Sequence, residues 1–166
     1  MRIRARLSVL IGTAALAACA STPPSVDRAP PQPPPAPTEG YDWILHEEAG
    51  EARLAYGVPE SDDLRIALDC RPGEGRLEVV ALAAADAEPV IQLESGGQAG
   101  TFAASGETDL IHDGLILSAA ARTNEPVFRQ FRHLAWLARW QDGEREVYVP
   151  HAGSAGRIER FFAFCG

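Results

Sequence analysis

The stretch Leu64-Arg65-Ile66-Ala67-Leu68-Asp69-Cys70 decides the fold that we expect for this 166-residue chain. Its apolar residues alternate with mostly polar ones, which is the period of a β-strand with one buried face. Cys70 shares the inward face of this strand with the apolar residues of the alternation. The sequence therefore places one thiol in the core of a sheet.

A second apolar face, which carries another cysteine, lies further along the sequence. Four residues recur there at the spacing of one face of an α-helix: Ile158, Phe161, Phe162 and Cys165. A helix packed on the sheet would bring the two thiols together, so we predict a Cys70–Cys165 disulfide. The alternative is two free or metal-bound thiols. Metal sites usually need three or four neighbouring ligands, and the sequence has no CxxC motif or Cys/His cluster.

Turn signals between short apolar runs predict the other strands. Asp113-Gly114 and Asp142-Gly143 suit two-residue hairpins, because both central positions need positive φ. Pro72-Gly73-Glu74-Gly75, Ser95-Gly96-Gly97 and Ala49-Gly50 mark further reversals. Roughly eight to ten strands at this spacing predict a mainly β fold, either an antiparallel β-sandwich or a small barrel.

One short internal helix is expected within this β fold. Asn124-Glu125-Pro126 is typical of a helix start and predicts a helix over Pro126–His133. The residues after it alternate as in a strand, with one set expected to face the core: Leu134, Trp136, Ala138 and Trp140. The C-terminal helix that carries Cys165 completes the expected fold.

The start of the chain has the three parts of an export signal. Arginines at positions 2, 4 and 6 precede an apolar run over 7–16, and small residues follow. That run is shorter than the roughly twenty apolar residues of a membrane-spanning helix. We therefore expect residues 1–18 to be a cleaved signal peptide.

The string Leu16-Ala17-Ala18-Cys19 resembles the lipobox of bacterial lipoproteins. The resemblance implies that the Cys19 thiol takes a diacylglyceryl group, that cleavage precedes Cys19, and that the new amino terminus is acylated. Ala20 rather than Asp follows the cysteine, which by similarity favours the outer membrane, facing the periplasm. Several acyl chains make attachment to a membrane long-lived. The alternative is an ordinary signal peptide cut nearby, with Cys19 incidental.

A proline-rich segment separates the signal from the part expected to fold. Residues 19–40 hold the lipidated cysteine and a spacer rich in proline, which favours an extended polyproline conformation. Its alternative is a proline-rich docking motif for a partner. Residues 41–166 are long enough for a single domain with a hydrophobic core.

Charge argues against one class of partner. The chain has a net charge of -8 and contains no lysine. Nucleic-acid-binding proteins usually carry a basic surface, so no nucleic-acid partner is expected. The expected partners are a membrane, through the lipid, and an envelope protein or glycan.

Residues that commonly carry chemistry are scattered through the sequence. The four histidines stand singly, and no cofactor motif or metal-ligand spacing is present. Ala152-Gly153-Ser154-Ala155-Gly156 is similar to the nucleophile elbow of α/β-hydrolases, but Ala152 replaces the first glycine. We expect Ser154 to cap the last helix. The alternative is a small serine hydrolase that uses Ser154 with His151 or a remote histidine.

The densest group of aromatic and basic residues lies between positions 128 and 140. Arg129, Arg132 and Arg139 form the one candidate binding patch, because arginine and aromatic rings are favoured at interfaces. Core packing of the aromatic residues is the stronger expectation. We therefore expect a lipid-anchored envelope protein with a non-catalytic binding or structural-accessory domain. A periplasmic inhibitor of a lytic enzyme or protease is the alternative among binding proteins.

Overall fold

The structure, a computed structural model, describes residues 35–110 and 113–166. The predicted signal peptide, Cys19 and the spacer up to residue 34 lie outside the described residues. The elements of the described part are β1 (Asp42–Glu48), β2 (Glu51–Gly57), β3 (Leu64–Cys70), β4 (Arg76–Ala84), β5 (Val90–Ser95), β6 (Gln98–Asp109), β7 (Gly114–Arg122), α1 (Pro126–Leu134), β8 (Leu137–Gln141), β9 (Glu144–Tyr148) and α2 (Ala155–Cys165).

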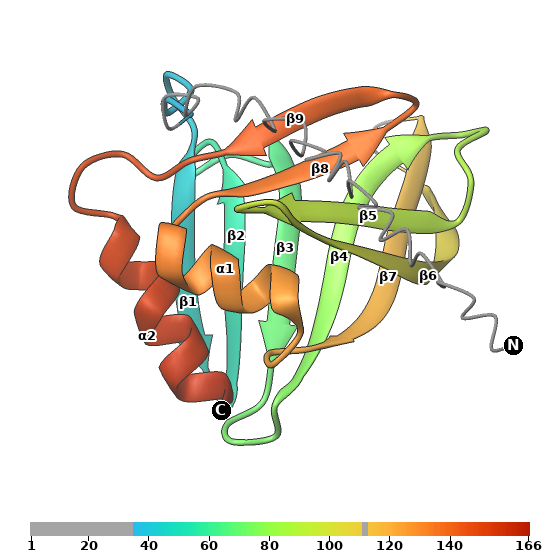
Figure 1. Cartoon of the computed structure of the whole chain (residues 1–166). Coiled ribbons are helices and arrows are strands. Elements are labelled where there is room, and N and C mark those ends of the chain that lie inside the picture. Colours follow the sequence, from blue (N-terminus) through green and yellow to red (C-terminus); the bar gives the residue numbers. More distant parts are fainter. Residues whose placement is uncertain (1–34, 111–112) are drawn as a thin grey trace, which may run out of the picture. The chain divides into compact units, whose positions relative to one another are not determined.

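The strands form one curled sheet, seen in Figure 1, with the order β1-β2-β3-β4-β7-β6-β5-β8-β9. Every pairing is antiparallel. β6 belongs to both halves of the sheet, because residues up to Ala103 pair with β5 and residues from Ala104 pair with β7. The prediction of a mainly β, antiparallel fold is confirmed.

The core lies on the inner face of the curl. Leu54, Leu68, Val79 and Ala119 lie opposite one another across β2, β3, β4 and β7, and each is buried. This row follows from the alternation of apolar residues along each strand, which places every second side chain on the same face. The opening stretch 64–70 is β3, as predicted, and Ile66, Leu68 and Cys70 are its buried inner residues.

Both helices pack against this inner face. α1 contacts β5 and β6, whereas α2 contacts β1 and β2. Phe131 of α1 lies 4.9 Å from the ring of Trp43 and 5.8 Å from the ring of Phe162 in α2, measured between ring centroids. The predicted internal helix is thus confirmed, and it ends one residue later than expected.

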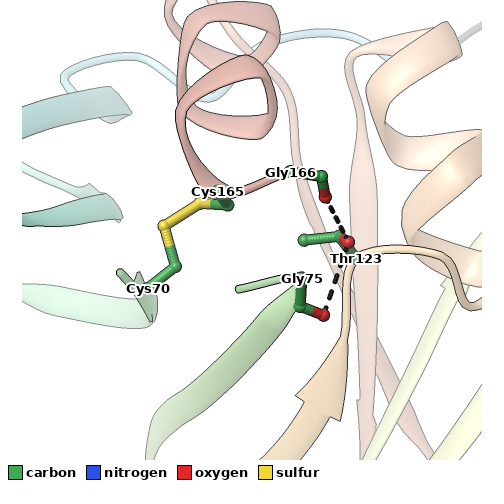
Figure 2. The surroundings of a disulfide bond; sticks show 5 residues. All are labelled: Cys70, Gly75, Thr123, Cys165 and Gly166. Carbon is green, nitrogen blue, oxygen red and sulfur yellow. Dashed lines mark hydrogen bonds between the residues drawn. A yellow bond between two sulfur atoms is a disulfide. The ribbon is translucent and has the colours of Figure 1, made fainter. Parts of the chain in front are cut away.

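The predicted disulfide is also confirmed. Cys70 at the end of β3 is bonded to Cys165 of α2, with the two Cα atoms 5.7 Å apart (Figure 2). It links the sheet to the C-terminal helix across 95 positions of sequence.

The end of α2 is held by further bonds beside the disulfide. The amides of Gly73 and Gly75, in the turn after β3, donate to the carbonyls of Phe164 and Cys165 at 3.0 and 2.9 Å. Figure 2 shows the Thr123 hydroxyl, which donates to the Gly166 carbonyl at 2.6 Å. The last carbonyls of a helix have no partner within the helix, and here other parts of the chain satisfy them.

Candidate functional site

The structure places the three arginines of the predicted patch in different surroundings. Arg129 and Arg132 are exposed on α1. Arg129 donates to the Asn124 carbonyl, and Arg132 makes two hydrogen bonds to the Glu159 carboxylate of α2. Arg139, in β8, is buried, with 5% of its surface exposed. The three side chains therefore do not form one exposed patch.

Arg139 is buried because β8 begins later than the alternation of residues 134–140 predicted. The strand starts at Leu137, which pairs with Tyr148 of β9, and this pairing turns Leu137 and Arg139 toward the core. Of the residues expected to face inward, Leu134 ends α1 and is 39% exposed, and Trp140 is 41% exposed. The prediction was therefore wrong for Leu134 and Trp140, whereas Ala138 is buried as expected and Trp136 is half-buried.

The guanidinium of Arg139 is only partly satisfied. Its Nη1 donates to the Leu82 carbonyl at 2.6 Å, while Nε is buried without a hydrogen-bond partner. Among the described residues no carboxylate forms an ion pair with it. Burying a charge is costly unless the charge is paired and hydrogen-bonded. Arg139 thus stands out as an unusual group in this core.

Tyr148 interacts with this arginine, and Tyr56 packs against Tyr148. The Tyr148 hydroxyl donates to Glu146 Oε2 at 3.0 Å. Burial, and then the Glu146 charge, raise the pKa of Tyr148, although Arg139 acts in the opposite direction. The ring of Tyr56 lies 5.0 Å from that of Tyr148, and the Tyr56 hydroxyl is buried without a partner. Both unpartnered buried atoms that the structure identifies therefore lie around Tyr148.

Arg139 lines two hollows. The first, which we name the Arg65 hollow, has a volume of about 420 Å³. The second, the Gln92 hollow, has a volume of about 230 Å³. The Arg65 hollow is lined by Asp62, Asp63, Leu64, Arg65, Leu82, Arg139, Gln141 and Glu146. The Gln92 hollow is lined by Ala87, Glu88, Val90, Gln92, Leu117, Arg139, Trp140, Gln141, Asp142 and Gly143.

The charged groups of the Arg65 hollow already contact one another. Tyr41 donates to the Asp63 carboxylate, and Arg65 Nη2 donates to the Tyr41 hydroxyl at 2.5 Å. Arg65 Nε also lies 3.5 Å from Asp63 and 3.7 Å from Glu146. The Gln92 hollow differs, because it combines the apolar side chains of Val90 and Leu117 with amides and two exposed acids.

A larger hollow, of about 690 Å³, lies over charged residues of β1 to β4. Each of the three arginines that line it is already paired with an acid there: Arg53 with Asp69, Arg71 with Glu51, and Arg76 with Glu74. Its cationic groups are therefore neutralised within the hollow.

Ser154 is buried, with 5% of its surface exposed. Its hydroxyl donates to the Asp42 carboxylate, and His151 Nε2 lies 3.0 Å from the Thr38 carbonyl. Ser154 occupies the N-cap position of α2 but makes no side-chain cap bond, so the predicted capping role was wrong. The hydrolase alternative requires a histidine at an accessible Ser154 hydroxyl, whereas this hydroxyl is buried and bonded to Asp42, and His151 lies against the Thr38 carbonyl.

The described residues hold no group of three or more His, Cys, Asp or Glu side chains that could bind a metal ion. Within the same residues, no helix has the length and apolar character to cross a membrane. No protein-family model matches the chain, and no curated protein or solved structure is significantly similar to it.

Proposed function

We propose that this chain is an exported, lipid-anchored protein of the cell envelope whose domain binds a ligand or partner without catalysis. The observation that carries the export proposal is the Cys70–Cys165 disulfide. Disulfides persist in oxidising compartments and are rare in the cytosol. The disulfide agrees with the export signal and with the lipobox-like string that ends at Cys19.

The binding role is supported by the two hollows that Arg139 lines. Buried polar groups are usually hydrogen-bonded, and an exception calls for an explanation such as a functional role. The unpartnered Nε of Arg139 and the hydroxyl of Tyr56 are two such exceptions. We therefore propose that a lipid tether presents this binding domain at the outer membrane, facing the periplasm. This accounts for both the lipobox-like N-terminal segment and the folded domain with its hollows.

We also propose that the curled sheet is a small open barrel. The proposal is supported by a bond between its two end strands, in which the Trp43 indole of β1 donates to the Tyr148 carbonyl of β9 at 3.4 Å. It is also supported by β6, which continues from one half of the sheet into the other.

The anchor is tested by expressing the full chain and Cys19→Ala in a bacterial host and fractionating the cells. We expect the wild type in the membrane fraction, with a mature chain that begins at an acylated Cys19 in the mass spectrum. Cys19→Ala should not gain acyl mass. A wild-type chain cut elsewhere and left unacylated would overturn the anchor. A chain kept in the cytosol with reduced cysteines would overturn export altogether.

A further inference from the structure

One edge of β1 has no neighbouring strand in the part of the chain that the structure describes, because β1 lies at the end of the sheet and pairs with β2 alone. The backbone of Trp43 shows which groups face this edge. Its N–H donates to Asp42 Oδ1 at 2.9 Å, and its C=O accepts from Arg157 Nη1 of α2 at 2.7 Å. Every second residue of an antiparallel strand directs its N–H and C=O to the same side. Leu45 and Glu47 therefore direct theirs away from β2, as Trp43 does.

A hollow of about 460 Å³, which we name the β1–α2 hollow, lies along this edge. β9 and the loop after it reach β1 nearer its start, where the Trp43 indole donates to the Tyr148 carbonyl and the His151 amide donates to Asp42. Further along, α2 runs beside β1 (Figure 1). The hollow is lined by Leu45 and Glu47 of β1 and by Gly153, Gly156, Arg157 and Arg160.

The alternating N–H and C=O groups of a strand edge are a template for another strand. A peptide that adds to such an edge gains main-chain hydrogen bonds, while side-chain contacts select its sequence. We propose that the β1–α2 hollow binds an extended segment of a partner protein, which adds to β1 as a strand opposite Leu45 and Glu47.

The charges of the hollow favour a segment with one acidic side chain on the side of α2. Two arginines and one acid line this hollow, whereas acids outnumber arginines in each of the three hollows described above. Among the described residues, Arg160 donates to Glu47 through Nη2 alone, and Arg157 donates to Asp42 and to the backbone through Nη1 alone. A guanidinium offers five N–H donors, so both arginines keep donors for a carboxylate of the partner. Glu48, on the opposite face of β1 from Glu47, would repel a second acid there.

A second copy of this chain fits the edge less well than another protein does. The chain has a net charge of -8. Two β1 strands side by side would bring Asp42, Glu47 and Glu48 of both copies together, and like charges on neighbouring strands destabilise a sheet. The β1–α2 hollow is also separate from the two hollows that Arg139 lines, so the proposed binding role of those hollows stands or falls independently.

The test selects ligands from a library of random heptapeptides displayed on phage, with the purified full chain as the target. The most enriched peptide is then synthesised and titrated into the chain labelled with ¹⁵N. We expect this peptide to contain an acidic residue and to shift the amide resonances of Leu45 and Glu47 in a saturable manner. It should also slow the hydrogen exchange of these two amides, because each becomes bonded in a strand pair.

Two changes at Gly156 separate the hollow from the fold. A Cβ at this position would meet no heavy atom within 4 Å, and glycine is unfavourable within a helix, so both variants should be folded. Gly156→Trp fills the hollow and should weaken binding of the peptide on the order of tenfold or more. Gly156→Ala, the matched control, should bind it like the wild type. Arg160→Gln should weaken binding roughly two- to fivefold, because the lost ion pair is exposed.

Three outcomes would overturn the inference. The first is a library that yields no peptide bound more tightly by the wild type than by Gly156→Trp. The second is a peptide whose shifts lie away from Leu45 and Glu47. The third is a wild type that sediments as a dimer, which Gly156→Trp breaks and Gly156→Ala keeps, because the occupant would then be a second copy. Equal binding by Arg160→Gln and the wild type would contradict the acidic side chain.

Discussion

Tyr56 and Tyr148 pack against each other in the core, yet their hydroxyls have different surroundings. The Tyr148 hydroxyl donates to Glu146, whereas that of Tyr56 is buried without a partner. Removing one member of a hydrogen bond costs about 0.5–1.5 kcal/mol, and removing an unpartnered buried polar group costs nothing or stabilises. We expect Tyr148→Phe to lower the free energy of unfolding by about 1 kcal/mol and Tyr56→Phe to leave it equal or higher.

Urea unfolding of the two variants beside the wild type measures this difference. Each variant serves as the control for the other, because both remove one hydroxyl from neighbouring rings with centroids 5.0 Å apart. Equal losses in both variants would show that the Tyr56 hydroxyl has a partner in solution.

Arg139 shows what the sequence could not reveal at the scale of a single residue. The stretch that contains it was expected to hold aromatic core residues and exposed arginines. The structure instead exposes Trp140 and buries Arg139. Alternation alone determines which residues share a face, but the start of the strand determines which face is inside. Local composition does not carry that information, because it depends on the pairing of β8 with β5 and β9.

Among the elements, the two-residue hairpins have a predictable energetic weakness. Ala49 and Gly50 join β1 to β2, and Asp142 and Gly143 join β8 to β9, all four with positive φ. The left-handed conformation raises the free energy of a residue with a Cβ by roughly 1–2 kcal/mol, and Asn or Asp adopts this conformation more readily than Ala. We expect Ala49→Asn to raise the free energy of unfolding by about 0.5–1 kcal/mol.

Asp142→Ala tests the same argument in reverse, since it places alanine in the equivalent position of the other hairpin. It should lower the free energy of unfolding by a similar amount. Chemical denaturation measures the unfolding free energy of both variants. The prediction requires a rise for Ala49→Asn and a fall for Asp142→Ala. A loss of stability in Ala49→Asn would show that a contact of the alanine methyl stabilises the fold by more than the better turn conformation of Asn does.

The contact between α1 and α2 predicts a dependence on pH. The hydrogen bonds from Arg132 lower the pKa of Glu159. A carboxyl group with a lowered pKa in the folded state stabilises the fold above its unfolded pKa, near 4.3, and loses this contribution as the pH falls through the folded value. Arg132→Met should therefore be less stable than the wild type at pH 7, by less than about 1 kcal/mol because the pair is exposed.

The difference between Arg132→Met and the wild type should shrink progressively below about pH 4. Melting temperatures recorded from pH 7 to pH 3 measure it. Arg129→Met is the control, because its guanidinium contacts the Asn124 carbonyl and no acid. A difference that is constant with pH would show that Arg132 contributes through packing rather than charge.

The elements themselves were largely readable from the sequence, and their order in the sheet was not. The hairpins at Ala49-Gly50 and Asp142-Gly143 and the helix from Pro126 depend on neighbouring residues and were predicted. The pairings of β4 with β7 and of β5 with β8 join strands that are distant in sequence. Turn residues cannot encode such pairings, which depend on how the whole curl closes over the two helices.

At the scale of the whole molecule, the disulfide closes a loop that contains most of the described chain. On the chain-entropy model, a crosslink across 95 positions stabilises by up to about 4–5 kcal/mol. We expect the double variant Cys70→Ala with Cys165→Ala to lose several kcal/mol of unfolding free energy, within that limit. Urea unfolding measures the loss.

Reductant provides the control for this prediction. It should lower the stability of the wild type toward that of the double variant and leave the double variant unchanged. A double variant as stable as the oxidised wild type would mean that the bonds from Gly73, Gly75 and Thr123 hold α2 in place without the crosslink.

The packing of α2 on β1 and β2 has a consequence for how the chain emerges during synthesis. The helix is made after all nine strands of the described residues, yet it packs on the first two. A nascent chain that has reached only Tyr148 leaves the apolar face of its first hairpin without this cover, and such exposed surfaces promote aggregation. The earliest-made part of the domain therefore stays uncovered for longest.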